Sequence, residues 1–216
     1  MIEALHNNGL MLDMHQIMRL TTYLEQLNHW NRAYNLTAIT DPMEQVYKHI
    51  VDSLCIHEAI KGERIADIGT GAGLPGIPLA IMFPEKQFTL VDSHHKRIMF
   101  IQHVVITLKL SNVMALHHRV ETFRPSGLFD AVVSRAFSSL HDFVEKTQHL
   151  LIENGELLAM KGEYPSDELG KIPRDFYAAE VKKLVIHGLQ AERHLVRINV
   201  RSPPKSYKIT LFYSCA

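Results

Sequence analysis

The feature that most constrains the fold is a glycine-rich turn directly after a short apolar run. Residues 65–68 are IADI, and residues 69–76 are GTGAGLPG. Closely spaced glycines between a strand and a helix let backbone N–H groups approach a ligand without obstruction by Cβ atoms, at a helix N-terminus where the dipole is positive. The pattern therefore predicts a strand–turn–helix unit that binds a small molecule.

From residue 64 onward, short apolar runs alternate with helical stretches. The predicted strands are residues 65–68, 88–92, 113–117, 129–134, 156–160, 180–186 and 194–200. Segments long enough for crossover helices separate the first five, which is typical of parallel strands, whereas the last two are too close for a crossover and predict an antiparallel hairpin. We therefore predict an α/β fold with a doubly wound, mostly parallel seven-stranded sheet and an antiparallel edge hairpin.

Two amphipathic helices are predicted before the sheet. Apolar residues recur at three- and four-residue steps over residues 13–34, where Asp13 is the predicted N-cap and Gln16 reaches back to it. A second helix begins at Asp41, followed by a proline at the first helical position, with Glu44 completing a capping box. These helices predict an N-terminal helical extension.

The length of 216 residues favours one domain with an appendage, at roughly 150 residues per domain. We expect residues 1–60 to be the helical extension, packed on a ligand-binding domain of residues 61–216. Cys55 and Cys215 are far apart and lack metal-ligand spacing, which favours a reducing compartment. With no signal peptide and no long apolar stretch, we expect a cytoplasmic monomer that does not contact a membrane.

Acidic residues accompany each of the first three predicted strands. Asp67 lies near the end of the first strand, and Asp92 ends the second, where a carboxylate can accept both ribose hydroxyls. Glu121, after Val120, follows the third strand and is positioned for an adenine edge. A buried carboxylate is tolerable beside a cationic ligand and costly beside a diphosphate. The constellation therefore favours an adenosine cofactor without a pyrophosphate.

Further segments carry a family resemblance. They are WNRAYNLT (30–37), HIVDS (49–53), GTGAGLPGIP (69–78), VSRAF (133–137), KG (161–162) and ERHL (192–195). The ordered glycine turn and acids resemble the class I, Rossmann-like S-adenosylmethionine-dependent methyltransferases. With these segments, the chain more closely resembles the small-subunit ribosomal RNA methyltransferase G family, also called glucose-inhibited division protein B, over about residues 10–200.

The resemblance implies a bacterial enzyme that uses S-adenosylmethionine to convert a guanine of 16S rRNA to 7-methylguanosine. Its partner would be 16S rRNA, within the 30S subunit or its precursor. By position, the family's cofactor contacts fall on Gly69, Leu74, Val120, Glu121 and Arg135. To these the glycine and acid pattern adds Gly71, Gly73 and Asp92. The tail 202–216 departs from the family pattern, which leaves the roles of Lys205 and Lys208 open.

The residues after the fourth strand agree with an N7 acceptor, and they would also fit other acceptors with an available lone pair. Methylases of exocyclic amines usually carry Asn/Asp-Pro-Pro-aromatic there, and pyrimidine C5 methylases need a cysteine nucleophile, but residues 134–137 are SRAF. Guanine N7 has an available lone pair, so no general base is expected. Arg135 could hold guanine O6 or the cofactor edge, or form a structural ion pair. Phe137 could stack on the flipped base or pack in the core.

The formal net charge is zero, but residues 171–216 carry nine Lys/Arg against three acids. Local clustering decides phosphate binding, so this segment is a candidate RNA surface or a solvated basic face. Lys161 ends the fifth strand, and Lys96 and Arg97 follow Asp92, where they would contact phosphate or remain ordinary exposed charges. The predicted RNA-binding residues are Arg32, Lys96, Arg97, Lys161, Arg197 and Arg201.

Two alternative functions stay open at this point. Gly71, Gly73 and Gly76 also match the dinucleotide pattern G-x-G-x-x-G, so an NAD-dependent oxidoreductase is one alternative. A non-enzymatic RNA-binding assembly factor with a vestigial cofactor site is another. The pairs at 94–95 and 117–118 suggest metal ligands, but adjacent histidines point in different directions, so no metal is expected. His49 could face RNA or pack between the two helices.

Overall fold

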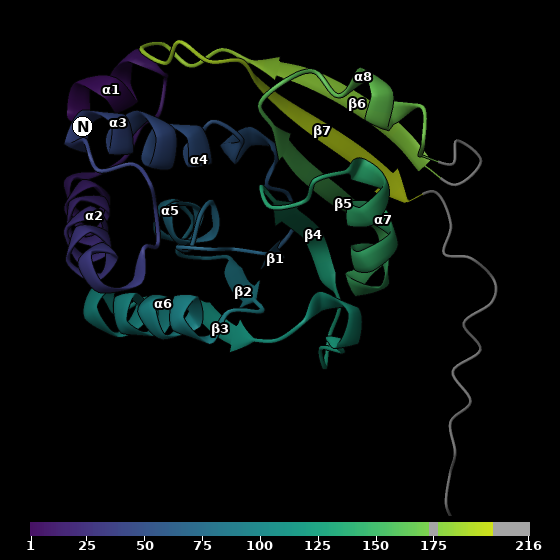
Figure 1. The fold of residues 1–216 in the computed structure, drawn as a ribbon, viewed down its shortest axis with the longest axis horizontal. Coiled ribbons are helices and arrows are strands. Elements are labelled where there is room, and N and C mark those ends of the chain that lie inside the picture. The colour runs from purple at the N-terminus through teal and green to yellow at the C-terminus, as the bar shows by residue number, and fades with distance from the viewer. Residues whose placement is uncertain (173–176, 201–216) are drawn as a thin grey trace, which may run out of the picture.

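The computed structural model describes residues 1–172 and 177–200, which form a sheet flanked by helices (Figure 1). The strand order in the seven-stranded sheet is β3-β2-β1-β4-β5-β7-β6. The strands are β1 (Arg64–Ile68), β2 (Gln87–Asp92), β3 (Val113–His117), β4 (Phe129–Ser134), β5 (Leu151–Lys161), β6 (Tyr177–Leu184) and β7 (Arg193–Val200). Strands β1 to β5 are parallel, β7 is antiparallel to β5, and β6 is antiparallel to β7 at the edge. The predicted sheet and edge hairpin are confirmed.

Two strands differ from their predicted bounds by more than one residue. β5 begins at Leu151, five residues before the predicted start, and its register against β4 shifts between Phe129 and Ala131. Asn154, with φ of 63°, lies in this irregular part of the strand. The apolar pattern begins only after the bulge, which is why it missed the first residues of the strand. β6 spans 177–184 instead of 180–186.

The helices are α1 (Ile2–Asn7), α2 (Met14–Tyr34), α3 (Pro42–Gln45), the π-helical segment η1 (Val46–Val51), α4 (Asp52–Leu54), α5 (Gly76–Met82), α6 (His95–Leu108), α7 (Leu140–Thr147) and α8 (Ser166–Leu169). Short 3₁₀ turns are η2 (His57–Ala59), η3 (Val120–Thr122) and η4 (Gln148–Leu150). Among the described residues, no helix combines the length and apolar character needed to cross a membrane.

The predicted N-caps begin both N-terminal helices. Asp13 Oδ1 accepts from Gln16 N at 2.7 Å, and Gln16 Oε1 accepts from Asp13 N at 3.0 Å, which confirms the capping box of α2. At α3, Asp41 Oδ1 accepts from Glu44 N at 2.8 Å. The Glu44 carboxylate, however, accepts from Lys48 Nζ at 2.9 Å, one helical turn later, so it serves an ion pair and not the predicted return contact.

The core has two parts, one on each face of the sheet. On one face α5 and α6 contact β2, and α2 packs on both helices; on the other, α7 contacts β5. Leu20, Tyr23 and Leu27 of α2 are fully buried in the same apolar cluster as α5 and α6. Burying such a side chain stabilises the fold by about 1.5–3 kcal/mol. The helical extension is therefore packed on the sheet domain, whereas the boundary at residue 60 stays a prediction.

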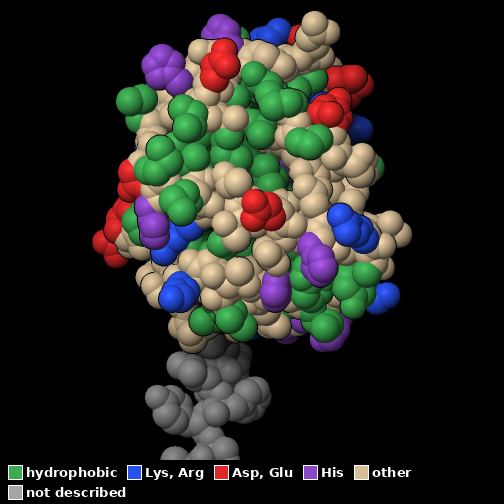
Figure 2. All heavy atoms as spheres, turned by 90° about the vertical axis from the view of Figure 1, so that its left-hand side faces the viewer, with side chains coloured by type: hydrophobic (Ala, Val, Ile, Leu, Met, Phe, Trp, Pro, Cys, Tyr) green, Lys and Arg blue, Asp and Glu red, His purple; other side chains and the backbone are tan. Residues whose placement is uncertain are grey.

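The outer side of the helical extension carries exposed apolar side chains. Figure 2 shows hydrophobic side chains among the charged ones on the face that holds α1 and α2. Ile2, Met14 and Met18 are exposed there. The buried stripe of α2 thus faces the sheet, and its methionines face solvent.

Candidate functional site

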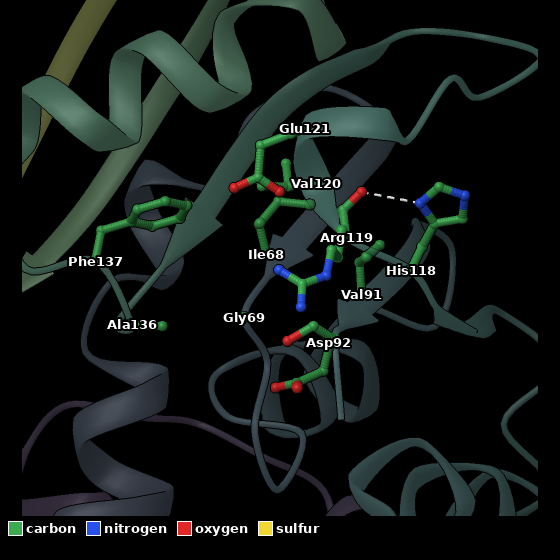
Figure 3. Close-up of a pocket in the computed structure, with 11 residues that line it drawn as sticks. Ile68, Gly69, Val91, Asp92, His118, Arg119, Val120, Glu121, Ala136 and Phe137 are labelled. Atoms are coloured by element: carbon green, nitrogen blue, oxygen red, sulfur yellow. Dashed lines mark hydrogen bonds between the residues drawn. The ribbon is translucent and has the colours of Figure 1, made fainter. Parts of the chain in front are cut away.

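A pocket of about 160 Å³ opens where β1, β2 and β4 end (Figure 3). Four predicted cofactor residues line it, namely Gly69, Asp92, Val120 and Glu121. Phe137, after β4, lines the same pocket. In an open α/β sheet, ligands usually bind at the carboxyl ends of the parallel strands, at the point where the strand order reverses. The predicted site residues thus converge from segments that are far apart in the chain.

The glycine turn requires residues without a side chain. Gly69, Gly71 and Gly73 have φ of 70°, 61° and 90°, which L-residues rarely adopt. A Cβ on Gly69 would lie 2.6 Å from the Cβ of Ala136, so the turn and the loop after β4 approach as closely as a glycine allows. A Cβ on Gly71 would meet no heavy atom within 4 Å, so the turn is open to a ligand there.

Gly71, Gly73 and Leu74 do not line the pocket. Gly73 is packed against Ile77, and Leu74 is buried with its N–H bonded to the Thr70 carbonyl at 2.9 Å. Gly73 and Leu74 thus form the inner half of the turn that leads into α5, whereas Gly71 is half-buried. Their contact with a cofactor stays a prediction.

Asp92 joins the glycine turn to the start of α6. Its side chain is 3% exposed, and Oδ2 accepts from Gly71 N at 2.9 Å while Oδ1 accepts from His94 N at 2.8 Å. The ring of His94 and the guanidinium of Arg97 make the other two contacts, at 3.0 and 3.3 Å. The two backbone N–H donors are fixed. The His94 side chain is exposed and the Arg97 side chain is half-exposed, so ligand hydroxyls can replace them as donors to Asp92.

Asp67 holds the turn from beneath and does not line the pocket, so its expected place beside the ligand is wrong in detail. Its fully buried Oδ2 accepts from Thr70 Oγ1 at 2.7 Å and from Gly76 N at 2.8 Å. Oδ1 is buried and has no hydrogen-bond partner among the described residues. Burial raises the pKa of this carboxyl to about 6.

The raised pKa of Asp67 predicts an unusual pH dependence. Between about pH 4 and pH 6 the folded state holds a proton that the unfolded state has released, so the free energy of unfolding falls as pH rises through this window. Asp67→Asn keeps an oxygen for the Thr70 and Gly76 donors and removes the titration. We therefore compare the free energy of unfolding of Asp67→Asn with that of the unchanged protein. The value for the variant is expected to rise relative to the unchanged protein by roughly 2 to 3 kcal/mol from about pH 4 to about pH 6, because one pKa unit corresponds to about 1.4 kcal/mol. Urea unfolding across this range checks it; parallel profiles for both proteins would contradict it.

Arg135 forms the ion pair that the sequence left open as one alternative. Its Nη1 donates to Asp52 Oδ2 at 2.9 Å, and Arg193 Nε donates to Asp52 Oδ1 at 2.6 Å. The Asp52 side chain is 5% exposed. Arg135 does not line the pocket, and its contact with guanine or cofactor stays a prediction.

The Asp52 pairs were missed at the sequence level, although a signal for them was present. Asp52 lies in the apolar stretch HIVDSL of the second helix, where a buried carboxylate needs a partner. Nothing in the spacing identifies Arg135 and Arg193, which lie 83 and 141 residues away. The structure thus joins three of the segments that carried the family resemblance.

Phe137 and His49 had two interpretations each. The Phe137 ring is half-buried, and its centroid lies 5.1 Å from that of Phe143. The ring also borders the pocket, so it both packs in the core and faces the site.

His49 is 4% exposed and its Nε2 lies 3.0 Å from Thr37 Oγ1. Burial and the nearby Arg135 lower its pKa to about 4. His49 therefore packs between the helical segments as a neutral ring.

Two of the predicted RNA-binding residues, Lys161 and Arg197, are paired with carboxylates. The Lys161 ammonium, 13% exposed, donates to Glu168 at 2.9 Å and to the Phe137 carbonyl at 3.2 Å. Arg197 of β7 lies 3.4 Å from Glu156 of the neighbouring strand β5 and lines a separate cavity of about 440 Å³. These two cations are neutralised locally, Lys161 by a carboxylate of α8 and Arg197 by a carboxylate of β5.

The remaining predicted RNA contacts are more accessible. Arg32 is exposed in the last turn of α2, and Lys96 Nζ is 5.6 Å from the ring centroid of Tyr34. Arg97 is bound to Asp92 beside the pocket. Arg201, the tail lysines and Cys215 lie outside the described residues. Within the described part, no group of three or more His, Cys, Asp or Glu is arranged to hold a metal ion.

Comparisons with known proteins cover most of the chain. A model of the family described as rRNA small subunit methyltransferase G matches residues 16–196. A protein named ribosomal RNA small subunit methyltransferase G from Photobacterium profundum is 46% identical over 201 residues, which cover 93% of this chain and 98% of that protein. One of the same name from Pseudomonas aeruginosa is 48% identical, over 87% and 88% of the two chains. The crystal structure of a SAM-dependent methyltransferase from Aquifex aeolicus superposes with a TM-score of 0.59 at 17% identity, over 77% of this chain and 97% of that one, and is similar in fold.

Proposed function

Because the chain belongs to the rRNA small subunit methyltransferase G family, we propose that it transfers the methyl group of S-adenosylmethionine to N7 of a guanine in 16S rRNA. The observation that carries this function is the pocket at the strand ends, bordered by the glycine turn and the Asp92 carboxylate. In this proposal the enzyme acts as a cytoplasmic monomer, on 16S rRNA within the 30S subunit or its precursor.

The residues of the site fit this cofactor. The space beside Gly71 leaves the turn open, and the Asp92 carboxylate borders the place where ribose hydroxyls would bind. Glu121 borders the same pocket and is paired with Lys146 at 3.5 Å. Carboxylates favour a ligand with sulfonium and ammonium charges and oppose a diphosphate.

The reaction requires guanine N7 to be positioned against the methyl group, and it requires no general base. When bound, S-adenosylmethionine supplies a methyl group on a positively charged sulfur. The N7 lone pair forms the new bond as the sulfur–methyl bond breaks, and no proton has to leave guanine first. Phe137 borders the pocket and offers a ring on which the base stacks. Arg135, anchored by Asp52, fixes the loop from which Phe137 extends, and so acts as a positioning residue.

Calorimetric titration separates this function from an NAD-dependent oxidoreductase. We expect saturable heat from S-adenosylmethionine and none from NAD at the same concentrations. Saturable binding of NAD without binding of S-adenosylmethionine would overturn the assignment.

Transfer of a labelled methyl group tests the substrate. Naked 16S rRNA and 30S particles are compared at equal concentration, and we expect greater incorporation into the particles, where ribosomal proteins hold the RNA in shape. Cofactor binding without transfer to either form would favour the non-enzymatic assembly factor instead.

A further inference from the structure

Two pairs of adjacent histidines, far apart in the chain, meet beside the pocket. His94 and His95 follow β2, and His117 and His118 follow one another at the end of β3. β2 and β3 are parallel neighbours with Asp92 paired to His117, so both pairs lie at the same edge of the sheet. The rings of His95 and His117 are 5.3 Å apart, edge to face. All four residues are exposed. We call these four residues the histidine rim.

The groups that face the histidine rim are mostly cationic. They are Lys96 and Arg97 of α6, Arg119 and Glu121 after β3, Asp92 of β2, Tyr34 of α2 and, through Glu121, Lys146 of α7. Figure 3 shows His118, Arg119 and Asp92 along one side of the pocket. The permanent cations on the rim's own segments thus outnumber the two carboxylates before any histidine is protonated.

Both carboxylates are already engaged. Asp92 is 3% exposed and accepts from the glycine turn, from His94 and from Arg97. Glu121 is paired with Lys146 at 3.5 Å, on the far side of the pocket. Their negative charge is therefore largely compensated where the histidines meet solvent.

Two of the rings are held by backbone carbonyls. His117 Nε2 lies 3.0 Å from the Ser93 carbonyl, and His118 Nδ1 lies 2.9 Å from the Arg119 carbonyl. A carbonyl only accepts, so these ring nitrogens carry the hydrogen. The other nitrogen of each neutral ring is then an acceptor, and protonation turns it into a donor suited to a phosphate oxygen.

We propose that the histidine rim is a phosphate-binding surface that strengthens RNA binding as pH falls through the range in which imidazoles ionise. This inference rests on the proposed function, because the rim lies beside the pocket in which methyl transfer to RNA is proposed, and His118 borders that pocket. Each imidazolium that forms adds one positive charge to the permanent charges of Lys96, Arg97 and Arg119. Each phosphate neutralised releases counterions and steepens the salt dependence of binding.

The test measures filter binding of labelled, unmodified 16S rRNA, without cofactor, from about pH 5.5 to about pH 8 and at several salt concentrations. For the unchanged protein we expect affinity roughly tenfold higher at the lower pH, with a salt slope steeper by roughly 0.7 to 0.9 for each additional phosphate that is neutralised. In a variant with all four rim histidines replaced by glutamine, we expect affinity to change less than about twofold with pH and to match the unchanged protein at pH 8.

A matched control variant replaces His6, His15, His57 and His187 by glutamine. These histidines belong to α1, α2, η2 and the β6–β7 connection, away from the pocket. The control is expected to keep the full pH dependence. A pH dependence retained by the rim variant, lost by the control variant or missing from the unchanged protein would each overturn the proposal.

Methyl transfer is measured on the same preparations to keep the two proposals apart. If methyl transfer is observed but the pH dependence of RNA binding does not depend on the rim histidines, only the proposal for the histidine rim is overturned. A rim-dependent profile in a protein that transfers no methyl group to any form of 16S rRNA contradicts the proposed reaction, and leaves the rim as an RNA surface of a binding protein.

Discussion

Replacing Asp52 by alanine is expected to lower the free energy of unfolding by about 3 to 5 kcal/mol. Asp52 is 5% exposed and is shared by Arg135 and Arg193, whose side chains are 27% and 22% exposed. Without the carboxylate, two partly buried guanidinium groups lose their counter-charge at once. Equilibrium unfolding in urea measures the loss.

Glu58→Ala is the matched control for this variant. Glu58 is paired with Lys182 at 3.3 Å, but both side chains are more than half exposed, so its loss is expected to cost about 0 to 1 kcal/mol. Asp52→Asn, which keeps the shape and removes the charge, is expected to fall between the two. Equal losses for Asp52→Ala and Glu58→Ala would show that the shared carboxylate does not hold these segments together.

Replacing Asp92 by alanine is expected to weaken S-adenosylmethionine binding by about 100-fold or more. Two hydrogen bonds between a carboxylate and ribose hydroxyls contribute about 1.5 to 3 kcal/mol each, and every 1.4 kcal/mol is a factor of ten. The variant also releases Gly71 N, which Asp92 Oδ2 holds at 2.9 Å, so the turn itself is loosened. Calorimetry gives the dissociation constant directly.

Asp130→Ala controls for the loss of a carboxylate that organises backbone. Asp130 Oδ2 accepts from Glu63 N and Arg64 N, both at 2.8 Å, near the opposite ends of β1 and β4. This variant is expected to lose stability and to keep its cofactor affinity. If both variants bind S-adenosylmethionine as the unchanged protein does, Asp92 is not a ribose ligand.

The fold was largely predictable because its strands are buried runs separated by clear turn signals. Three of the observed strands lie within one residue of the bounds predicted for IADI, FTLVD and FDAVVS. The start of β5 was not predictable, since a bulge interrupts its apolar pattern. Helix α1 was missed because Ile2–Asn7 is too short to show a periodicity, and it is held by tertiary packing of Ala4 and Leu5.

The site was predictable to the level of segments, and less so to the level of atoms. Position at a strand end placed Gly69, Asp92 and Glu121 correctly around one pocket. It could not show that Asp67 turns under the loop, or that Lys161 meets Glu168. Such pairs depend on side-chain directions and long-range contacts, which sequence spacing does not encode.

The Asp52 cluster also gives the N-terminal extension a physical link to the site. Asp52 lies in α4, whereas Arg135 follows β4 and Arg193 begins β7. One carboxylate therefore ties the helical extension to the loop that carries Phe137. Loss of this link is expected to disturb the pocket edge as well as the overall stability.

Mapping the modified atom tests the central claim most directly. Unmodified 30S particles are incubated with the protein and labelled S-adenosylmethionine, and the extracted 16S rRNA is treated with borohydride and aniline, which cleave the chain at 7-methylguanosine. The account predicts labelled RNA that is cleaved at a single guanine. Label incorporated without such cleavage would place the methyl group on another atom and contradict the N7 assignment, and absence of label in the RNA would contradict the proposed reaction itself.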